Sequence, residues 1–334
     1  MYKSQPYYIK QQNVPQKRIN TMIYYLFPRF CLYPNSQLKC AYYNTLCVIS
    51  PSQYYYINEI KNRIENTPHW GKKSKNIYEK LCNKITIAQC SIVFFEIIEV
   101  CQLMHFNWNH YSTFTSLHFD KASIKSISYL RRNLKNDETI LCKSNMLEKY
   151  KTITTPFVDV AFCSAYLDEE YENCIELFKQ ICIVLCMQKQ KGSCIIKFGE
   201  SYSTLSLDIF CLLSYFYEKT YFIKPSASDL STGEKYIVCK HFLHEKLTEK
   251  TKTTIFSLYN QITNSKLMLS RIINIDIPLF ITSKMEEINS IFGQPRLEYI
   301  QQLLSQSEIK EDTSDHKCQE WIQKYIPELA LTNI

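Results

Sequence analysis

Glycine is scarce in this chain. Only five glycines occur among its 334 residues, and none lies between Gly71 and Gly192. Loops that cradle phosphates or dinucleotides depend on glycine, because it adopts positive φ angles and lets the backbone approach a ligand closely. Neither a G-x-G-x-x-G nor a Walker motif occurs. A glycine-rich nucleotide loop of the usual kind is therefore excluded.

The composition is that of a folded globular protein. Hydrophobic residues make up 46% of the chain and charged residues 21%, unlike the balance in disordered chains. The apolar stretch from Ile181 to Met187 is seven residues long, whereas a membrane span needs about 20. The N-terminal sequence MYKSQPYYIKQQ lacks the apolar core of a signal peptide. We therefore expect a cytoplasmic protein with no membrane partner.

The fifteen cysteines are scattered along the chain and form no C-x-x-C pair. Cys182 and Cys186 have helical i, i+4 spacing, but no second pair accompanies them, so small apolar core residues are the expected role. His105, His110 and His118 are spaced by five and eight residues, which does not place all three on one helical face. We expect no metal site and a reducing compartment.

Positive charge is concentrated in the first 80 residues. They carry twelve Lys and Arg against three Glu, whereas the whole chain has a net charge of +7. The same region is rich in tyrosine. Basic residues interleaved with aromatic rings are typical of surfaces that bind unpaired nucleic acid. A solvated extension with a few tyrosines packed on the core is the other interpretation, and both stay open.

Hydrophobic periodicity predicts alternating helices and strands. The expected helices span 75–103, 170–188, 205–217, 253–262, 283–292, 296–304 and 316–325. The expected strands span 139–142, 157–162, 193–198, 218–224 and 235–239. This alternation predicts an α/β fold with a mostly parallel sheet. Because no helix precedes the last strand, that strand is expected to be antiparallel, at the edge or between other strands.

Three regions are expected from these patterns. Residues 1–65 contain five prolines and show no sustained period, which predicts a basic, Tyr-rich extension with short elements. Residues 66–245 form the α/β domain, and residues 246–334 form a helical C-terminal cap.

The segment from Gly192 to Phe242 resembles the C-terminal half of the FtsJ-type ribose 2′-O-methyltransferase domain, in particular that of adrift-type mRNA cap methyltransferases. That family has a strand G-G-x-F-I-x-K, a later strand ending in K-P-x-x-S-R, and then S-E-x-Y-x-V. The matching residues are Gly192, Ile196, Lys197, Lys224, Pro225, Ser228, Glu234, Tyr236, Ile237 and Val238. The resemblance implies a Rossmann-like methyltransferase fold, S-adenosylmethionine as cofactor and capped mRNA as partner.

The family's chemistry uses a Lys-Asp-Lys-Glu tetrad, in which the central Lys removes a proton from a ribose 2′-hydroxyl. The resemblance places Lys197 at the central Lys and Glu234 at the Glu. The Asp position falls on Cys163, which is expected to be inactive. The first Lys falls close to Val93, and the nearest upstream Lys is Lys84. Two of the four tetrad positions therefore depart from the family pattern.

The cofactor loop departs as well. Family members carry P-G-G-F after the first strand, so that the backbone can lie against the methionine of the cofactor. The comparable segment here is expected at residues 105–114, which contain no glycine. Side chains there should crowd the cofactor. No cofactor-binding residue is therefore assigned.

The resemblance also suggests where RNA would bind. The family's substrate groove runs near the expected first helix, so phosphate contacts are expected at Lys72, Lys73 and Lys75, and also at Lys224. The bias towards Ile, Lys, Asn and Tyr is typical of AT-rich genomes, including those of large cytoplasmic DNA viruses. A viral replication site or virion is therefore an alternative location.

Two functions remain open. The favoured one is an mRNA cap ribose 2′-O-methyltransferase domain with impaired catalysis, which would use S-adenosylmethionine if it were active. The alternative is a non-catalytic RNA-binding or scaffold subunit of a capping or transcription complex, with a capping or polymerase protein as partner and no cofactor.

Overall fold

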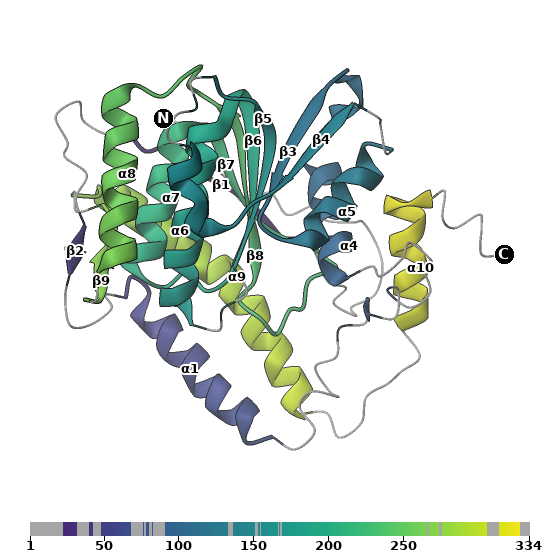
Figure 1. Cartoon of the computed structure of the whole chain (residues 1–334). Coiled ribbons are helices and arrows are strands. Elements are labelled where there is room, and N and C mark those ends of the chain that lie inside the picture. Colours follow the sequence, from purple (N-terminus) through teal and green to yellow (C-terminus); the bar gives the residue numbers. More distant parts are fainter. Residues whose placement is uncertain are drawn as a thin grey trace.

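The computed structural model describes residues 23–31, 40–42, 48–67, 76, 78–79, 82, 91–132, 136–150, 153, 155–165, 167, 169–265, 267–273, 276–305 and 314–327. Its centre is a seven-stranded sheet with the order β1-β7-β8-β6-β5-β3-β4 (Figure 1). The strands are β1 (Ile23–Phe27), β3 (Phe114–His118), β4 (Asp137–Leu141), β5 (Val158–Ser164), β6 (Gln188–Phe198), β7 (Tyr217–Lys224) and β8 (Lys235–Phe242).

Strand directions identify the fold class. β4, β3, β5 and β6 are parallel neighbours, whereas β8 is antiparallel to both β6 and β7. From β3 the chain moves to β4 on one side and then returns to β5 on the other, so the strand order reverses between β3 and β5. A mostly parallel sheet with an antiparallel strand inserted between β6 and β7 is the Rossmann-like methyltransferase arrangement, and β1 adds a second antiparallel strand at the edge beside β7. The predicted α/β fold class is confirmed, and β8 lies between two strands.

Helices cover both faces of the sheet (Figure 1). One face packs against α6 (Glu170–Met187), α7 (Thr204–Phe216) and α8 (Glu249–Asn264) in the main hydrophobic core. The other face packs against α4 (Ile92–Leu103) and α5 (Lys121–Leu130) in a second core. The strands of the sheet centre are apolar on both sides, as expected for strands buried between helix layers.

The C-terminal part of the chain is helical, as the sequence predicts. Besides α8 it contains α9 (Leu279–Ser305) and α10 (Ser314–Tyr325), while a short strand, β9 (Leu269–Arg271), pairs with β2 (Ala41–Tyr42). α10 packs on α4 through a third core. The two helices predicted over 283–292 and 296–304 are a single helix that continues through Pro295.

Part of the predicted extension belongs to the sheet. β1 pairs antiparallel with β7 along its whole length. Residues 51–65 form α1 (Pro51–Glu65), a longer helix than the short elements expected there. It packs along α9. The division of the chain at residues 65 and 245 stays a prediction.

The prediction of one helix over 75–103 is wrong. α4 begins at Ile92, and Ser91 before it is extended, with φ −108° and ψ 163°. Residues 83–90 lie outside the described part of the chain. The prediction also missed β3 and α5. β3 reads FTSLH, in which polar residues interrupt the apolar ones, although Ser116 and His118 are fully buried.

No helix in the described ranges combines the length and the apolar character that crossing a bilayer requires.

Phe210 tests the main core. Its ring is fully buried and lies 4.8 Å from Phe198, 4.7 Å from Phe222 and 6.3 Å from Phe27 between ring centroids. We expect Phe210→Ala to lower the free energy of unfolding by about 3–5 kcal/mol, because the cavity would be lined by rigid rings. Urea denaturation followed by circular dichroism measures this change.

The matched control is Phe280→Ala, because Phe280 is 60% exposed on α9. It should change the free energy of unfolding by no more than about 0.5 kcal/mol. Equal effects of the two substitutions would contradict the placement of Phe210 in the core.

Candidate functional site

Lys197 lies at the carboxyl end of β6 and is bound by two carboxylates. Its ammonium is 3.0 Å from Glu96 Oε2 and 3.1 Å from Glu234 Oε2. The Lys197 and Glu96 side chains are buried, whereas the Glu234 side chain is 38% exposed. The structure thus brings Lys197 and Glu234 together, and their catalytic roles stay predictions. Sequence reasoning missed Glu96.

Glu96 is the centre of a buried hydrogen-bond network. Besides Lys197, its carboxylate accepts hydrogen bonds from Tyr236 Oη at 2.8 Å and from Ser228 Oγ at 2.6 Å. All three donors come from segments far away in the chain. α4 is apolar apart from a few residues, so a Glu fully buried on it was the signal that could have drawn attention to this position.

The position predicted for the first tetrad Lys holds no cation. Val93 is buried in the second hydrophobic core on α4. Lys84 lies outside the described residues. The α4 side chain that reaches Lys197 is therefore an acid, Glu96, where the family pattern expects a base.

Cys163 does not face Lys197. Cys163 lies in the main hydrophobic core, with its Sγ 4.0 Å from Cys194 Sγ. The next residue, Ser164, is the β5 residue paired with Lys197, and paired residues of neighbouring strands share a face. The placement of the family's Asp position on Cys163 is thus one residue away from the site. Counting alternate residues from Phe162 would have identified Ser164.

Lys224 is not a surface contact for RNA. It is buried, and its ammonium donates to the carbonyl oxygens of Asp229, Thr232 and Glu234 at 2.7, 3.0 and 2.7 Å. Burial lowers the pKa of Lys224 to about 8. This lysine holds the loop between β7 and β8 in place, so its assignment to phosphate binding is corrected. Lys72, Lys73 and Lys75 lie outside the described residues.

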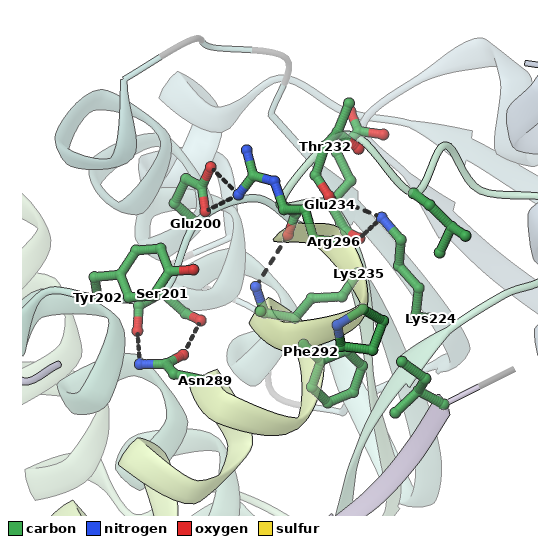
Figure 2. A pocket seen from close by; sticks show the side chains of 15 residues that line it. Glu200, Ser201, Tyr202, Lys224, Thr232, Glu234, Lys235, Asn289, Phe292 and Arg296 are labelled. Atoms are coloured by element: carbon green, nitrogen blue, oxygen red, sulfur yellow. Dashed lines mark hydrogen bonds and ion pairs between the residues drawn. The ribbon is translucent and has the colours of Figure 1, made fainter. Parts of the chain in front are cut away.

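A tight polar contact joins α9 to the chain after β6 and to the start of β8 (Figure 2). Arg296 forms an ion pair with Glu200 at 2.8 Å, and the Lys235 ammonium donates to the Gly199 carbonyl oxygen at 2.6 Å. Burial lowers the pKa of Lys235 to about 8. The space among these side chains is about 20 Å³, enough for a single water. This contact is a structural junction rather than a ligand site.

The predicted cofactor loop is misplaced. Residues 105–113 precede β3 instead of following it: they come after α4 and contain a short 3₁₀ helix, Trp108–His110. The loop that follows the first parallel strand is Phe119-Asp120, which leads directly into α5. The absence of glycine holds at this position too.

Asp120 bridges the strand ends where the strand order reverses. It is the N-cap of α5, and its Oδ1 accepts a hydrogen bond from the Ser123 amide at 2.8 Å. Its Oδ2 accepts from Ser164 Oγ at 2.8 Å. Since Ser164 pairs with Lys197, Asp120 and Lys197 are linked through adjacent strands. Ligands of open α/β sheets bind at this kind of reversal.

His118, the last residue of β3, is fully buried under this loop. Its ring stacks on Phe162 with 5.1 Å between centroids, and its Nδ1 is 2.8 Å from Ser123 Oγ. Its Nε2 has no hydrogen-bond partner among the residues that the structure describes. Burial lowers the pKa of His118 to about 4, against the opposite influence of Asp120. Within the described ranges, no group of His, Cys, Asp and Glu is arranged to hold a metal ion.

A cavity of about 840 Å³ opens beside this loop, at the carboxyl ends of β3 and β4. Its walls include Phe119 after β3 and Leu141, Cys142 and Met146 at the end of β4 and beyond. Its size is within the roughly 300–1,000 Å³ typical of small-molecule sites. By topology this is the place where a cofactor of this fold would lie.

Comparison with known proteins finds a family match over part of the chain. Residues 112–242 match the model of the FtsJ-like methyltransferase family. No curated protein matches the chain. This stretch runs from just before β3 to the end of β8, so it contains the cavity wall, Ser164, Lys197 and Glu234, whereas Glu96 lies outside it.

Several solved structures share low similarity with the chain. They include a Haemonchus contortus phospholethanolamine N-methyltransferase 2 (12% identity, 54% of this chain and 46% of that chain, TM-score 0.30). A Methanococcus jannaschii fibrillarin pre-rRNA processing protein has 12% identity over 40% of this chain and 57% of its own, with TM-score 0.22. Human methyltransferase-like protein 13 has 10% identity over 52% of this chain and 90% of its own, with TM-score 0.26. The chain thus covers about half of the length of the first two of these proteins.

His118 predicts a specific pH dependence of stability. Because its pKa is about 4 in the folded protein against 6.5 for an unperturbed histidine, the unfolded state binds more protons between these values. Its contribution to stability should therefore be lost as the pH falls from 6.5 to 4, by up to about 3 kcal/mol. Urea denaturation at several pH values measures this.

The control is His118→Asn, which retains a polar group near Ser123 and does not titrate. Its stability should depend less on pH over the same window, whereas identical pH profiles for the two proteins would rule out His118 as the cause.

Proposed function

Starting from the FtsJ-like methyltransferase domain at residues 112–242, we propose that the chain is an RNA ribose 2′-O-methyltransferase domain protein, of the mRNA cap type, with impaired catalysis. The observation that carries this proposal is the environment of Lys197, whose ammonium is bound by Glu96 and Glu234. Cytoplasmic and viral locations remain part of the proposal.

The charges around Lys197 oppose the role of a base. The family tetrad balances two lysines with two acids, whereas here the Lys197 ammonium lies between two carboxylates, and Lys224 donates to the backbone carbonyl of Glu234 rather than to its side chain. Hydrogen bonds from an ammonium to carboxylates are about twice as strong as neutral ones. A catalytic base must instead be free to approach a substrate hydroxyl.

The side chains around the cavity also do not match the groups of S-adenosylmethionine that they would have to bind. Phe119 and Asp120 stand where the family has glycines, so side chains occupy the space in which a backbone would lie against the cofactor. At the end of β4 the chain continues with Cys142 and Lys143, and neither can accept the hydrogen bonds of ribose hydroxyls as a carboxylate does. The residues present do not fit this cofactor, so we derive no methyl-transfer step.

The misfit of the cofactor cavity favours the second candidate. A domain that cannot hold the cofactor can still bind RNA or a capping or polymerase protein through its surface. The basic and Tyr-rich composition of the first 80 residues supports RNA as the partner. Under this alternative, the chain is a non-catalytic RNA-binding or scaffold subunit.

The proposal predicts weak or absent cofactor binding. Calorimetry with millimolar S-adenosylmethionine should detect no saturable binding, and capped RNA should not be methylated by the protein alone. Micromolar binding together with methyl transfer would overturn impaired catalysis. In that case Lys197→Ala should abolish the transfer, whereas Lys189→Ala, a control at the far end of the same strand, should leave it unchanged.

A second prediction concerns RNA binding by the N-terminal residues. Substitution of all four basic residues in residues 1–22 with Gln should weaken binding of a capped single-stranded RNA in fluorescence anisotropy. The slope of log K against log salt should decrease by up to about 3, since each lost phosphate contact removes roughly 0.7. The four are Lys3, Lys10, Lys17 and Arg18.

The control variant removes four positive charges from the helical C-terminal region instead. The four Gln substitutions are at Lys246, Lys250, Lys317 and Lys324. If the slope of log K against log salt decreases equally in both quadruple variants, the N-terminal residues have no special role and net charge alone explains the binding.

A further inference from the structure

We propose that the cavity at the carboxyl ends of β3 and β4 binds a nucleoside phosphate instead of the sulfonium cofactor of the family. Three independent features of the described residues lead to this inference: the position and size of the cavity, its exposed apolar wall, and its unpaired lysines. The inference rests on the proposed function only in taking this cavity to be the former cofactor cavity.

The position of the cavity suits a nucleotide-sized ligand. It lies beyond the carboxyl ends of β3 and β4, next to the reversal of strand order, because Asp120 in its wall accepts a hydrogen bond from Ser164 at the end of β5. In open α/β sheets nucleotides bind outside the carboxyl ends of the strands at this reversal. A volume of about 840 Å³ accommodates a nucleoside with one or more phosphates.

One wall of the cavity is apolar and open to solvent. Leu141 is 51% exposed although it ends a strand of the sheet, and it lines the cavity together with Phe119 and Met146. An exposed apolar surface inside a concave site is where a flat heterocyclic base or a similar ring would be buried. A ring that packs against this wall would gain binding affinity from the buried apolar surface, and this contribution would be similar for different bases.

The rim of the cavity is positively charged. Lys121, Lys143 and Lys149 line it. No ion pair links any of the three to a carboxylate within the described part of the chain. Lys121 is also the first residue of α5, so the partial positive charge of the helix N-terminus adds to that of the lysines.

The carboxylates of the cavity do not cancel this charge. Asp120 and Glu148 also line it, which leaves one more cation than anions. Both oxygens of Asp120 already accept hydrogen bonds, from the Ser123 amide and Ser164 Oγ. The cavity thus presents a net positive rim to a ligand, which repels a sulfonium compound of net positive charge and attracts a phosphate.

Lys143 occupies the position that decides between two ligand chemistries. It follows β4, the strand next to β3, at the place where dinucleotide-binding folds carry an acid about 20 residues after the first strand. An acid there binds ribose hydroxyls, whereas a cation near that place accommodates a phosphate on the ribose. The lysine therefore removes the acceptor for ribose hydroxyls and adds a cation that attracts the phosphates of a ligand bound in this cavity.

Calorimetry with ADP and with adenosine tests the inference on the full-length protein. ADP should bind at least about tenfold more tightly than adenosine, because charge-assisted bonds to its phosphates add to the burial of the base. Lys143→Gln should weaken ADP binding by about tenfold and leave adenosine binding unchanged. The control Lys250→Gln removes the same charge from an exposed position on α8 and should alter neither.

Two results would overturn the inference: ADP binding no tighter than adenosine binding, or ADP binding that Lys143→Gln leaves intact. Neither touches the proposed function, which depends on S-adenosylmethionine and RNA measurements. Competition against ADP with a 5′-phosphorylated and a 5′-hydroxyl RNA oligomer then identifies the source of the phosphate. Displacement by the phosphorylated oligomer alone indicates an RNA end, and displacement by neither indicates a free nucleotide.

Discussion

The buried ion pair between Lys197 and Glu96 is the contact on which the arrangement of the site depends. It joins β6 to α4 across the sheet face, and Tyr236 and Ser228 bind the same carboxylate. Removing one partner of such a pair leaves a buried charge without compensation, at a cost of about 3–5 kcal/mol. One turn along α4, Glu99 receives hydrogen bonds from Ser226, Ala227 and the Trp321 indole. Two acids of one helix therefore hold the loop after β7 and α10.

This network gives Lys197 and Glu234 a structural role that does not depend on catalysis. In an active tetrad the lysine would be poised to exchange a proton with a substrate hydroxyl. Here its ammonium completes the hydrogen bonding of a fully buried carboxylate, a task that any substitution would disrupt. A match to a methyltransferase motif is thus compatible with a structural role, because the same side chains serve both purposes.

The sequence predicted the fold well where strands and helices are continuous apolar runs, as in β6, α7, β7 and β8. It failed at β3, because Ser116 and His118 are buried polar residues that interrupt the pattern. It failed at the Asp position of the tetrad, because a one-residue shift in a strand moves a side chain to the other face. Glu96 could not be assigned at all, since its partners are more than 100 residues away.

The cavity combines a retained topology with altered chemistry. The reversal of strand order between β3 and β5 creates a crevice for purely geometric reasons, and it persists whatever side chains line it. What it binds depends on charge, and here the glycines are gone while lysines stand at the ends of β4 and the start of α5. Under the proposed inference, this crevice suits an anion better than a cationic cofactor. The fold therefore limits where a ligand binds, and the lysines determine which ligand it is.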